Sequence, residues 1–331
     1  MKNTTLEHAD IAILGGGPAG MQAALVASRS RKKVVVFDDP KPPRNGASPG
    51  VHNFLGLDGL LPTEIREIAW KQINVYQNAE LKKERVVDLR RNEDGRFLIT
   101  GAYGTKLEAT KVVLCVGYHD VYPDVPGFAE CWAKTIIQCP FCDGYENRDR
   151  IWGIVPGSDN ELQNFPHMAN NWASEINIFL PPGMEIDYIY RQELSDLGIT
   201  IYEGAVTRIH QTEGKLEAVT LDSGDNVKVG TLLWIPPVQS APLIQNLVEN
   251  LGLVLDESGF VKTDEMQQTN VNGLWAAGEV KGCCSNALDS AAAGSRAAKA
   301  IVRSWYMMNQ ASSKQMRCSI RTSMTYATQA M

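Results

Sequence analysis

Residues 10–38, DIAILGGGPAGMQAALVASRSRKKVVVFD, decide the fold of the first part of this chain. The apolar run DIAIL has the pattern of a short buried strand, and the glycine-rich GGGPAG is followed by an Ala-rich helical stretch and a second apolar run, VVVF. This order of strand, glycine turn, helix and strand is typical of a dinucleotide-binding unit. We therefore expect the chain to begin with an α/β domain.

Particular residues of this stretch stand where a bound dinucleotide needs them. Three glycines hold the positions for a tight turn, for close approach to a pyrophosphate and for packing of the helix on the strand: Gly15, Gly17 and Gly20. Asp38 ends the second strand, where its carboxylate can accept hydrogen bonds from a ribose hydroxyl. The alternative, a glycine turn that only packs a helix, leaves Asp38 as a coincidence, so the pattern predicts a dinucleotide site.

Length and composition limit the function classes. The 331 residues suggest two domains, at roughly 100–200 residues each, and no apolar run approaches the ~18 residues that a membrane span requires. A net charge of −6 argues against a broad nucleic-acid-binding surface. Since the N-terminal residues read as a first strand and not as a secretory signal, we expect a soluble cytoplasmic protein that binds neither nucleic acid nor membrane.

The string CPFCDGYE at 139–146 carries the most chemical information. Its two thiols, Cys139 and Cys142, can close a small disulfide loop, and a place near a helix start would lower the pKa of a thiolate. Seven cysteines in a chain without a signal argue against a purely structural disulfide framework. Zinc takes about four ligands, and the chain offers no second Cys-x-x-Cys. We therefore favour a redox pair over a metal site or an idle pair, and we assign no metal.

Two strings together resemble the two-domain flavin disulfide reductases. NGLWAAGEV at 272–280 is similar to the C-terminal Gly-Asp segment of that family, and CPFCDGYE is similar to the dithiol of the low-molecular-weight thioredoxin reductases. The resemblance implies FAD as the cofactor, Cys142 as the sulfur nearer the flavin, Cys139 as the sulfur that attacks the partner, and Asp143 as the general acid/base. It also implies a set of FAD-binding positions, with Glu279 in place of the family's Asp: Gly15, Gly17, Pro18, Ala19, Gly20, Asp38, Asn53, Val87, Gly117, Gly278, Glu279, Ala287 and Leu288.

The middle of the chain departs from that family where NADPH binds. In IWGIVPGSDNEL at 151–162, Pro156, Ser158 and Glu161 occupy the places of the small fingerprint residues, and the acids add negative charge where a pyrophosphate would lie. The next strand, INIFLPPGMEIDY, contains no Arg or Lys to grip a 2′-phosphate. The sequence thus predicts that NADPH does not bind in the usual way.

Three families with this departure are known: dithiol oxidases that use oxygen, ferredoxin-dependent flavin thioredoxin reductases, and cyanobacterial diflavin-linked disulfide oxidoreductases. CPFCDGYE, HNFLGLDG at 52–59 and the chain length resemble the third group most, which implies a second flavin in place of NADPH or an unidentified donor such as ferredoxin. His52 in this loop is a candidate base, or else a solvated loop residue.

We therefore predict two Rossmann-like α/β domains of the thioredoxin reductase type. The FAD-binding domain spans 1–120 and 240–331, and the redox domain with the Cys-x-x-Cys spans 121–239. The predicted function is NADPH-independent two-electron exchange between FAD and the Cys139/Cys142 pair, in a homodimer that acts on a thioredoxin-like protein or a small dithiol or disulfide. The alternatives are an oxygen-using dithiol oxidase and a non-catalytic flavin-binding redox sensor.

The last block of the chain is predicted to contain a strand over 272–280 and an Ala-rich helix over about 286–308. The other cysteines and the last residues lie outside the motifs above. Cys115 reads as a core residue, and Cys131 and Cys318 have no motif. Cys283 and Cys284 follow Glu279, where a relay role competes with a structural one. Residues 309–331 form a tail that either covers a flavin, with Tyr326 stacked on it, or has no role there.

Overall fold

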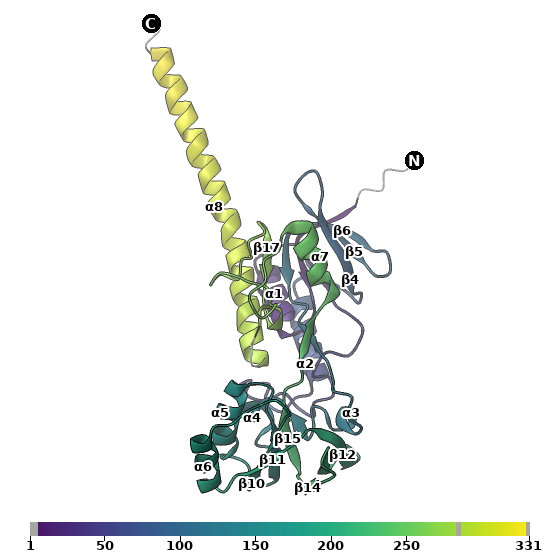
Figure 1. Ribbon diagram of the computed structural model, residues 1–331. Helices are drawn as coiled ribbons and strands as arrows, with labels where there is room; N and C mark the ends of the chain where they lie inside the picture. Colours follow the sequence, from purple (N-terminus) through teal and green to yellow (C-terminus); the bar gives the residue numbers. More distant parts are fainter. Residues whose placement is uncertain (1–5, 283–285, 329–331) are drawn as a thin grey trace. The chain divides into compact units, whose positions relative to one another are not determined.

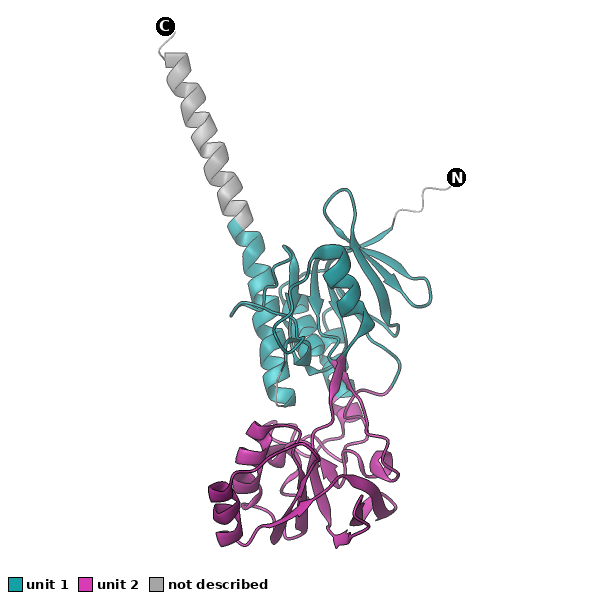
Figure 2. Ribbon diagram, viewed as in Figure 1, with its two compact units in different colours: residues 1–41, 66–117, 240–331 teal, residues 42–65, 118–239 magenta. Residues whose placement is uncertain are grey.

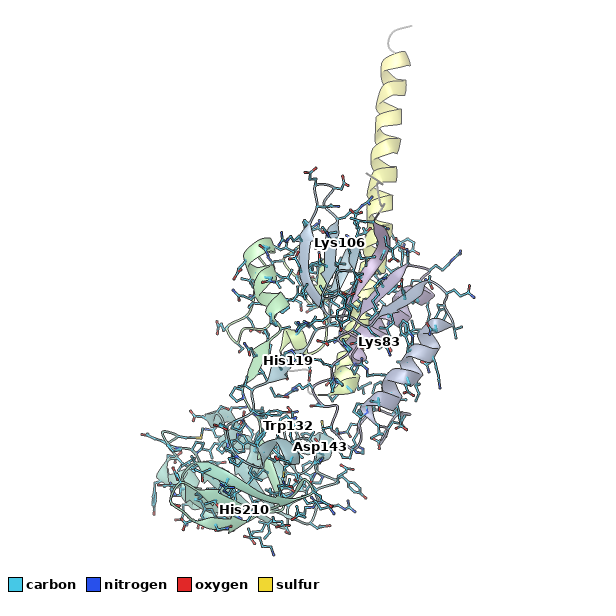
Figure 3. The ribbon with its side chains drawn as sticks, turned by 90° about the vertical axis from the view of Figure 1, so that its right-hand side faces the viewer. Lys83, Lys106, His119, Trp132, Asp143 and His210 are labelled. Atoms are coloured by element: carbon cyan, nitrogen blue, oxygen red, sulfur yellow. The ribbon has the colours of Figure 1, made fainter. Side chains whose placement is uncertain are left out.

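The computed structural model describes residues 6–282 and 286–328, with side chains given as far as Met307. Figure 2 shows the two compact units into which the chain divides. The first unit comprises Met1–Lys41, Arg66–Gly117 and Ser240–Met331, and the second comprises Pro42–Ile65 and Tyr118–Gln239. In Figure 3, Lys106 marks the first unit, and Asp143 and His210 mark the second.

The elements are labelled in Figure 1. Those of the first unit, with α2 beginning in the last residues of Pro42–Ile65, are β1 (Glu7–Leu14), α1 (Pro18–Arg29), β2 (Val34–Phe37), α2 (Pro62–Asn74), β3 (Ala79–Lys82), β4 (Val86–Arg91), β5 (Phe97–Gly101), β6 (Lys106–Leu114), α7 (Pro242–Leu251), β17 (Leu274–Ala276), the 3-10 turn η1 (Glu279–Lys281) and α8 (Ala287–Thr328). Those of the second are β7 (Tyr118–Asp120), α3 (Phe128–Cys131), β8 (Ile136–Ile137), α4 (Pro140–Asp143), β9 (Ile151–Val155), α5 (Asp159–Ala169), β10 (Glu175–Leu180), α6 (Tyr188–Asp196), β11 (Thr200–Glu203), β12 (Val206–Thr212), β13 (Lys215–Leu221), β14 (Asn226–Lys228), β15 (Thr231–Trp234) and β16 (Val238–Ser240).

The first unit is built on one mixed sheet. Its strands follow the order β3-β2-β1-β6-β5-β4, with β17 also paired to β6. The strands β3, β2, β1, β6 and β17 run parallel, whereas β5 and β4 are antiparallel. The run VVVF of β2 is buried along its whole length, as expected for a parallel strand covered on both faces. The small residues of α1 and α8 pack on one face and the apolar residues of α7 on the other.

The second unit repeats the α/β plan on a smaller scale. Its parallel sheet has the order β11-β10-β9-β15-β8, and a separate antiparallel sheet is formed by β12, β13 and β14. Apolar residues of α5 and α6 cover one face of the parallel sheet, and the antiparallel sheet contributes Val206, Ile209 and Val219 to a second core. The predicted α/β class with two Rossmann-like units is therefore confirmed.

The segment Pro42–Ile65 differs from the expected organisation, because we placed it in the first domain and it clusters with the second unit. Arg44 forms a buried ion pair with Asp120 at 2.7 Å and also donates to Gln138, and its guanidinium lies 4.4 Å from the centre of the Tyr118 ring. Asp120 lies 76 positions from Arg44 in sequence and Gln138 lies 94 positions away. No local sequence pattern therefore predicts these contacts.

Two elements near the C-terminus have other bounds than expected. The strand predicted over 272–280 is limited to β17, because Gly278, at φ 82°, turns the chain into η1. The helix predicted over 286–308 continues as α8 to Thr328. Cys283 and Cys284 lie outside the described residues, and the side chains of Cys318 and Tyr326 lie outside the described side chains.

Candidate active site

The candidate site has two parts, one in each unit. In the first unit, the carboxyl ends of β1, β2, β6 and β17 lie at one edge of the parallel sheet. Gly15 follows β1 with φ 111°, and a Cβ there would collide with the carbonyl of Cys115. A Cβ at Gly20 would collide with the carbonyl of Gly15. Only glycine therefore permits this tight turn from strand to helix.

The N-terminus of α1 is left open by the turn. Gly17 is the N-cap residue, no side chain caps the helix, and Pro18 occupies its first turn, where a missing N–H is harmless. A Cβ at Gly17 would have no atom within 4 Å. The N–H groups of Gly17, Ala19 and Gly20 are thus left without a side-chain cap beside open space, and the helix dipole favours a negative charge such as a dinucleotide phosphate there.

Asp38 lies at the end of β2, beside this turn. Its Oδ1 accepts a hydrogen bond of 2.9 Å from the N–H of Gly16, and its Oδ2 forms an ion pair with Arg66 of α2. The carboxylate is only 13% exposed, so a ribose hydroxyl would share it with these two donors. Arg66 is a site residue that sequence reasoning missed.

Residues after β6 and β17 complete the first part. The N–H of Ala277 donates to Leu114 at 2.9 Å and so aligns the two strand ends. Gly117, at φ 64°, faces the Glu279 carboxylate, whose Oε2 would lie 3.6 Å from an added Cβ. Gly278 packs on Ala19, whose methyl would lie 2.9 Å from a Cβ at that glycine.

The start of α8 is capped from within. Asn286 precedes the helix, and its Oδ1 accepts from the N–H of Asp289 at 2.8 Å. Ala287 and Leu288 are the first two residues of α8, and the side chain of Leu288 is 43% exposed. These positions fit a bound dinucleotide flavin as far as the described residues show it.

Two predicted FAD-binding residues are placed differently from the rest. Asn53 belongs to the second unit, and its side-chain amide donates to the carbonyl of Phe141 at 2.5 Å. Val87 lies on β4, the outermost strand of the path beyond β6 and β5, and its carbonyl accepts from Asn246 of α7 at 3.5 Å. Asn53 therefore belongs to the unit that carries the dithiol, and Val87 belongs to the unit that carries the glycine turn.

The dithiol forms the second part of the site. Cys139 is the N-cap residue of the short helix α4, Cys142 lies within it, and both are present as thiols. A hydrogen bond from the Cys142 thiol, helped by the N–H groups of Cys142 and Phe141, lowers the pKa of Cys139 to about 6 despite burial. The same hydrogen bond, burial and the charge of Asp143 raise the pKa of Cys142. Cys139 is thus the thiolate of the pair near neutral pH, and Cys142 is the thiol.

Asp143 is the last residue of α4, directly after Cys142. Burial, with the negative charges of Cys139 and Glu146, raises the pKa of Asp143 to about 7, and His52 acts in the opposite direction. A carboxyl that titrates near neutral pH beside a thiolate can give or take a proton during thiol exchange.

A buried asparagine holds this helix to the sheet of the second unit. Asn147 is only 2% exposed, and its Nδ2 donates to the carbonyls of Asp143 at 2.9 Å and of Lys134 at 3.2 Å. Its Oδ1 accepts from Thr231 of β15 at 3.1 Å. Sequence reasoning missed Asn147, because its partners are distant in the chain.

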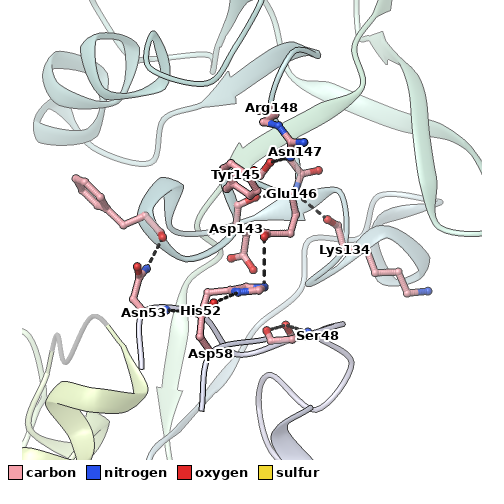
Figure 4. A network of polar contacts seen from close by, with 12 residues as sticks. Ser48, His52, Asn53, Asp58, Lys134, Asp143, Tyr145, Glu146, Asn147 and Arg148 are labelled. Atoms are coloured by element: carbon pink, nitrogen blue, oxygen red, sulfur yellow. Dashed lines mark hydrogen bonds and ion pairs between the residues drawn. The ribbon is translucent and has the colours of Figure 1, made fainter. Parts of the chain in front are cut away.

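The loop around His52 lies against the dithiol helix within the second unit (Figure 4). His52 Nε2 lies 3.5 Å from Oε1 of Glu146, and Nδ1 lies 3.7 Å from Oδ2 of Asp58. Asn53 adopts the left-handed conformation at φ 61° and donates its N–H to Asp58 at 2.8 Å.

The second Rossmann-like turn, between β9 and α5, is closed by its own side chains. Ser158 caps α5 and accepts from the N–H of Glu161 at 3.3 Å, while the Glu161 carboxylate accepts from the N–H of Gly157 at 2.8 Å. This arrangement is a variant of the capping box, in which the carboxylate accepts from the N–H of the residue before the N-cap and not from the N-cap itself. A carboxylate of the chain therefore lies where the first unit has an open helix N-terminus.

No helix within the described ranges has the length and apolar character needed to cross a membrane. Among residues 6–282 and 286–307, no three His, Cys, Asp or Glu side chains come together as metal ligands.

An open dinucleotide turn and a dithiol on two α/β units define a disulfide oxidoreductase. A sequence profile of the family Pyridine nucleotide-disulphide oxidoreductase matches residues 9–151 and 176–305. The chain belongs to this family, as a thioredoxin reductase-like flavin-dependent enzyme.

Individual relatives are similar over most of their length. Thioredoxin reductase aclD of Aspergillus oryzae is 29% identical over 303 residues, which is 88% of this chain and 95% of that protein. The crystal structure of TrxB from Bacillus anthracis has a TM-score of 0.84 at 27% identity and covers 91% of this chain and 99% of its own. The crystal structure of HlmI has a TM-score of 0.83 at 29% identity, over 97% of this chain and 99% of its own.

Proposed function

We propose that this protein exchanges two electrons between bound FAD and the Cys139/Cys142 pair, and between this pair and an external dithiol or disulfide, without using NADPH. The observation that carries the proposal is the capping box of α5. The N–H of Gly157 is already bonded to Glu161, so a pyrophosphate there would displace a half-buried carboxylate and then meet its negative charge.

The first unit supplies the flavin site in this proposal. The N–H groups of Gly17, Ala19 and Gly20 would hold the pyrophosphate. Asp38 would hold the ribose, and the Gly278–Glu279 segment would hold the flavin end of the cofactor. When bound, FAD supplies two-electron redox chemistry that no side chain of the protein offers.

The second unit supplies the thiol chemistry. Cys139 is the sulfur that attacks or is attacked by the external partner, because its thiolate is the more stable of the two. Cys142 is the sulfur that exchanges electrons with the cofactor. Asp143 holds or releases the proton that the leaving sulfur needs.

The partner is a thioredoxin-like protein or a small dithiol or disulfide, which agrees with the name thioredoxin reductase carried by the Aspergillus oryzae relative. We further propose a homodimer, as expected from the family resemblance, and a cytoplasmic location. Since the capping box opposes any pyrophosphate at this turn, we do not place the diphosphate of a second flavin there.

A dithiol oxidase is the second candidate, and the closed turn favours it as well. If no nicotinamide delivers electrons, an external dithiol can, and oxygen can remove them. The balanced overall reaction is R(SH)2 + O2 giving R(S–S) + H2O2, in which the dithiol loses two electrons and two protons. A ferredoxin-type donor would drive the pair in the opposite direction.

The decisive experiment follows the absorbance of oxidised flavin in the anaerobic holoprotein. We expect dithiothreitol to bleach the flavin and micromolar NADPH to leave it unchanged. Rapid bleaching by NADPH would overturn the proposal. Cys142→Ser is the matched control, in which FAD stays bound and the dithiol no longer bleaches it.

Admitting air then separates the two candidates. One hydrogen peroxide formed for each dithiol consumed supports the oxidase. Slow recovery in air, with bleaching by a reduced ferredoxin, supports the reductive direction.

A further inference from the structure

His52 is the one imidazole that faces the dithiol helix, and the function proposed above gives it no role. The side chain is 21% exposed and lies between two carboxylates, Glu146 at 3.5 Å and Asp58 at 3.7 Å. Figure 4 shows the carboxyl group of Asp143 directed toward the same ring. His52 therefore faces the Asp143 carboxyl, and it also acts to lower the pKa of that carboxyl.

The loop is shaped to hold the imidazole in this place. A Cβ at Gly50 would lie 3.0 Å from His52 Nε2, and one at Gly59, which has φ 78°, would lie 4.0 Å from Cε1. The bond from Asn53 to the Phe141 carbonyl fastens the adjacent residue to α4. Glycines make room for the ring, and Asn53 fixes its distance from the dithiol helix.

Exposure increases outward along this group of side chains. His52 is 21% exposed, Glu146 35% and Asp58 63%. The charged groups facing His52 are therefore Asp143 of α4, Glu146 of the turn that follows, and Asp58 of its own loop, with the Cys139 thiolate behind Asp143. Arg148 is engaged elsewhere, with the Tyr145 carbonyl at 2.6 Å and its ring at 4.1 Å.

The thiol chemistry requires a proton exit at this place. When an external dithiol reduces the Cys139–Cys142 disulfide, the S–S bond breaks, two electrons pass to the pair, and the dithiol gives up two protons as its own S–S bond forms. One proton stays on Cys142, while Cys139 remains a thiolate near neutral pH. The second proton must leave, and the mostly buried Asp143 is the first acceptor in reach.

We propose that His52 is a positioning residue that relays protons between the Asp143 carboxyl and solvent, with Glu146 and Asp58 orienting its imidazole. This inference rests on the proposed exchange at the dithiol. In the reverse direction, when the pair reduces an external disulfide, His52 returns the proton along the same side chains.

The test is the pH dependence of flavin reduction by dithiothreitol, measured by stopped flow on the anaerobic holoprotein. His52→Gln should slow the reduction at neutral pH by about tenfold or more, since general acid–base catalysis typically contributes ~10²–10⁴-fold. The inflection of the profile should move to higher pH, because the positive charge that lowers the pKa of Asp143 is lost. Added imidazole should restore part of the rate.

His167→Gln is the matched control. His167 Nε2 of α5 lies 3.9 Å from Oε1 of Glu193 in the same unit, so it forms a comparable pair without a dithiol nearby in sequence. Its rate and profile should equal those of the unchanged protein. The relay would be overturned if His52→Gln had the same pH profile as the unchanged protein. A slowed reaction that added imidazole does not restore would overturn it too.

Asp58→Asn covers the case in which His52→Gln does not fold. The new amide keeps an oxygen for the N–H of Asn53 but removes the charge beside Nδ1. A smaller slowing with the same imidazole rescue supports the relay, and an unchanged profile contradicts it. If dithiols fail to reduce the flavin of the unchanged protein, the proposed function is wrong. If dithiols reduce it and both variants have the pH profile of the unchanged protein, only the relay is wrong.

Discussion

At the scale of single residues, the two thiols differ because one donates to the other. We expect the alkylation of Cys139 by iodoacetamide, in the reduced holoprotein, to rise with pH around a midpoint near 6, since the thiolate is the nucleophile. Cys142→Ala removes the donor, so the midpoint should move toward the ~8.5 of an ordinary thiol, with a roughly tenfold or larger loss of rate at pH 7. Peptide mass spectrometry measures the site-specific rate.

Cys142→Ser is the control for that measurement, because the hydroxyl keeps a donor. It should shift the midpoint less than Cys142→Ala does. Equal midpoints in both variants and in the unchanged protein would show that the Cys142 thiol does not set the pKa of Cys139.

Asp143 makes a second prediction at this scale. Its pKa is raised to about 7 by burial, so the folded protein favours the protonated carboxyl over the unfolded chain, where the pKa is ~3.9. The stability it contributes is complete below the unfolded pKa and is lost as the pH rises toward 7. Asp143→Asn should therefore raise the melting temperature at pH 8 but not at pH 4, while it slows thiol exchange.

The exposed Asp149 provides the comparison for this prediction. Its side chain is 90% exposed, so Asp149→Asn should leave the melting temperature unchanged at both pH values. A stabilisation by Asp143→Asn that is the same at pH 4 and pH 8 would contradict the assigned cause.

At the scale of elements, the capping box of α5 should contribute measurably to the free energy of unfolding. Ser158→Ala should lower the free energy of unfolding by about 1 kcal/mol, because the N–H of Glu161 loses its acceptor. Asp187→Ala removes the comparable cap of α6, which accepts from Tyr190 at 2.9 Å, and should cost a similar amount. Urea unfolding of both variants gives the comparison, and no loss for Ser158→Ala would mean that the box does not hold the turn.

Local sequence patterns predicted an element well where the residues of the pattern themselves make the element form. The run VVVF was placed at 34–37 and forms β2, because a short, fully apolar run after a glycine turn and a helix suits a parallel strand buried on both faces. The same holds for Gly15 and Gly20, whose missing Cβ atoms permit the turn.

Features that depend on distant partners escaped prediction. Nothing near Arg44 in sequence indicates Asp120, and nothing near Asn147 indicates Thr231, which lies 84 positions away. The contact of Asn53 with the Phe141 carbonyl escaped prediction for the same reason, since the two residues are 88 positions apart. Short motifs therefore indicated the dithiol, the glycine turn and His52 as a candidate base, whereas the contacts that tie residues 42–65 to the second unit emerged only from the fold.

At the scale of the whole molecule, the chain uses the strand–turn–helix plan twice with opposite outcomes. The first turn has an uncapped helix and space beside Gly17, and the second has a capped helix with Glu161 on the Gly157 N–H. One architecture thus yields one open anion site and one closed site, and the difference lies in the side chains at two turns.

This asymmetry predicts one flavin for each chain, as FAD. Gly17→Val should abolish FAD binding without unfolding the protein, because the backbone there is extended, at φ −76° and ψ −174°, and an added side chain meets only the space that the phosphate needs. Gly157→Ala is the counterpart in the second turn and should leave one FAD per chain, since its Cβ would lie 3.5 Å from Glu161 Oε2 in ordinary contact. Acid extraction, chromatography of the released flavin and protein quantitation give the ratio, and circular dichroism checks the fold. Two flavins per chain in the unchanged protein, or FAD retained by Gly17→Val, would contradict the assignment of a single open turn.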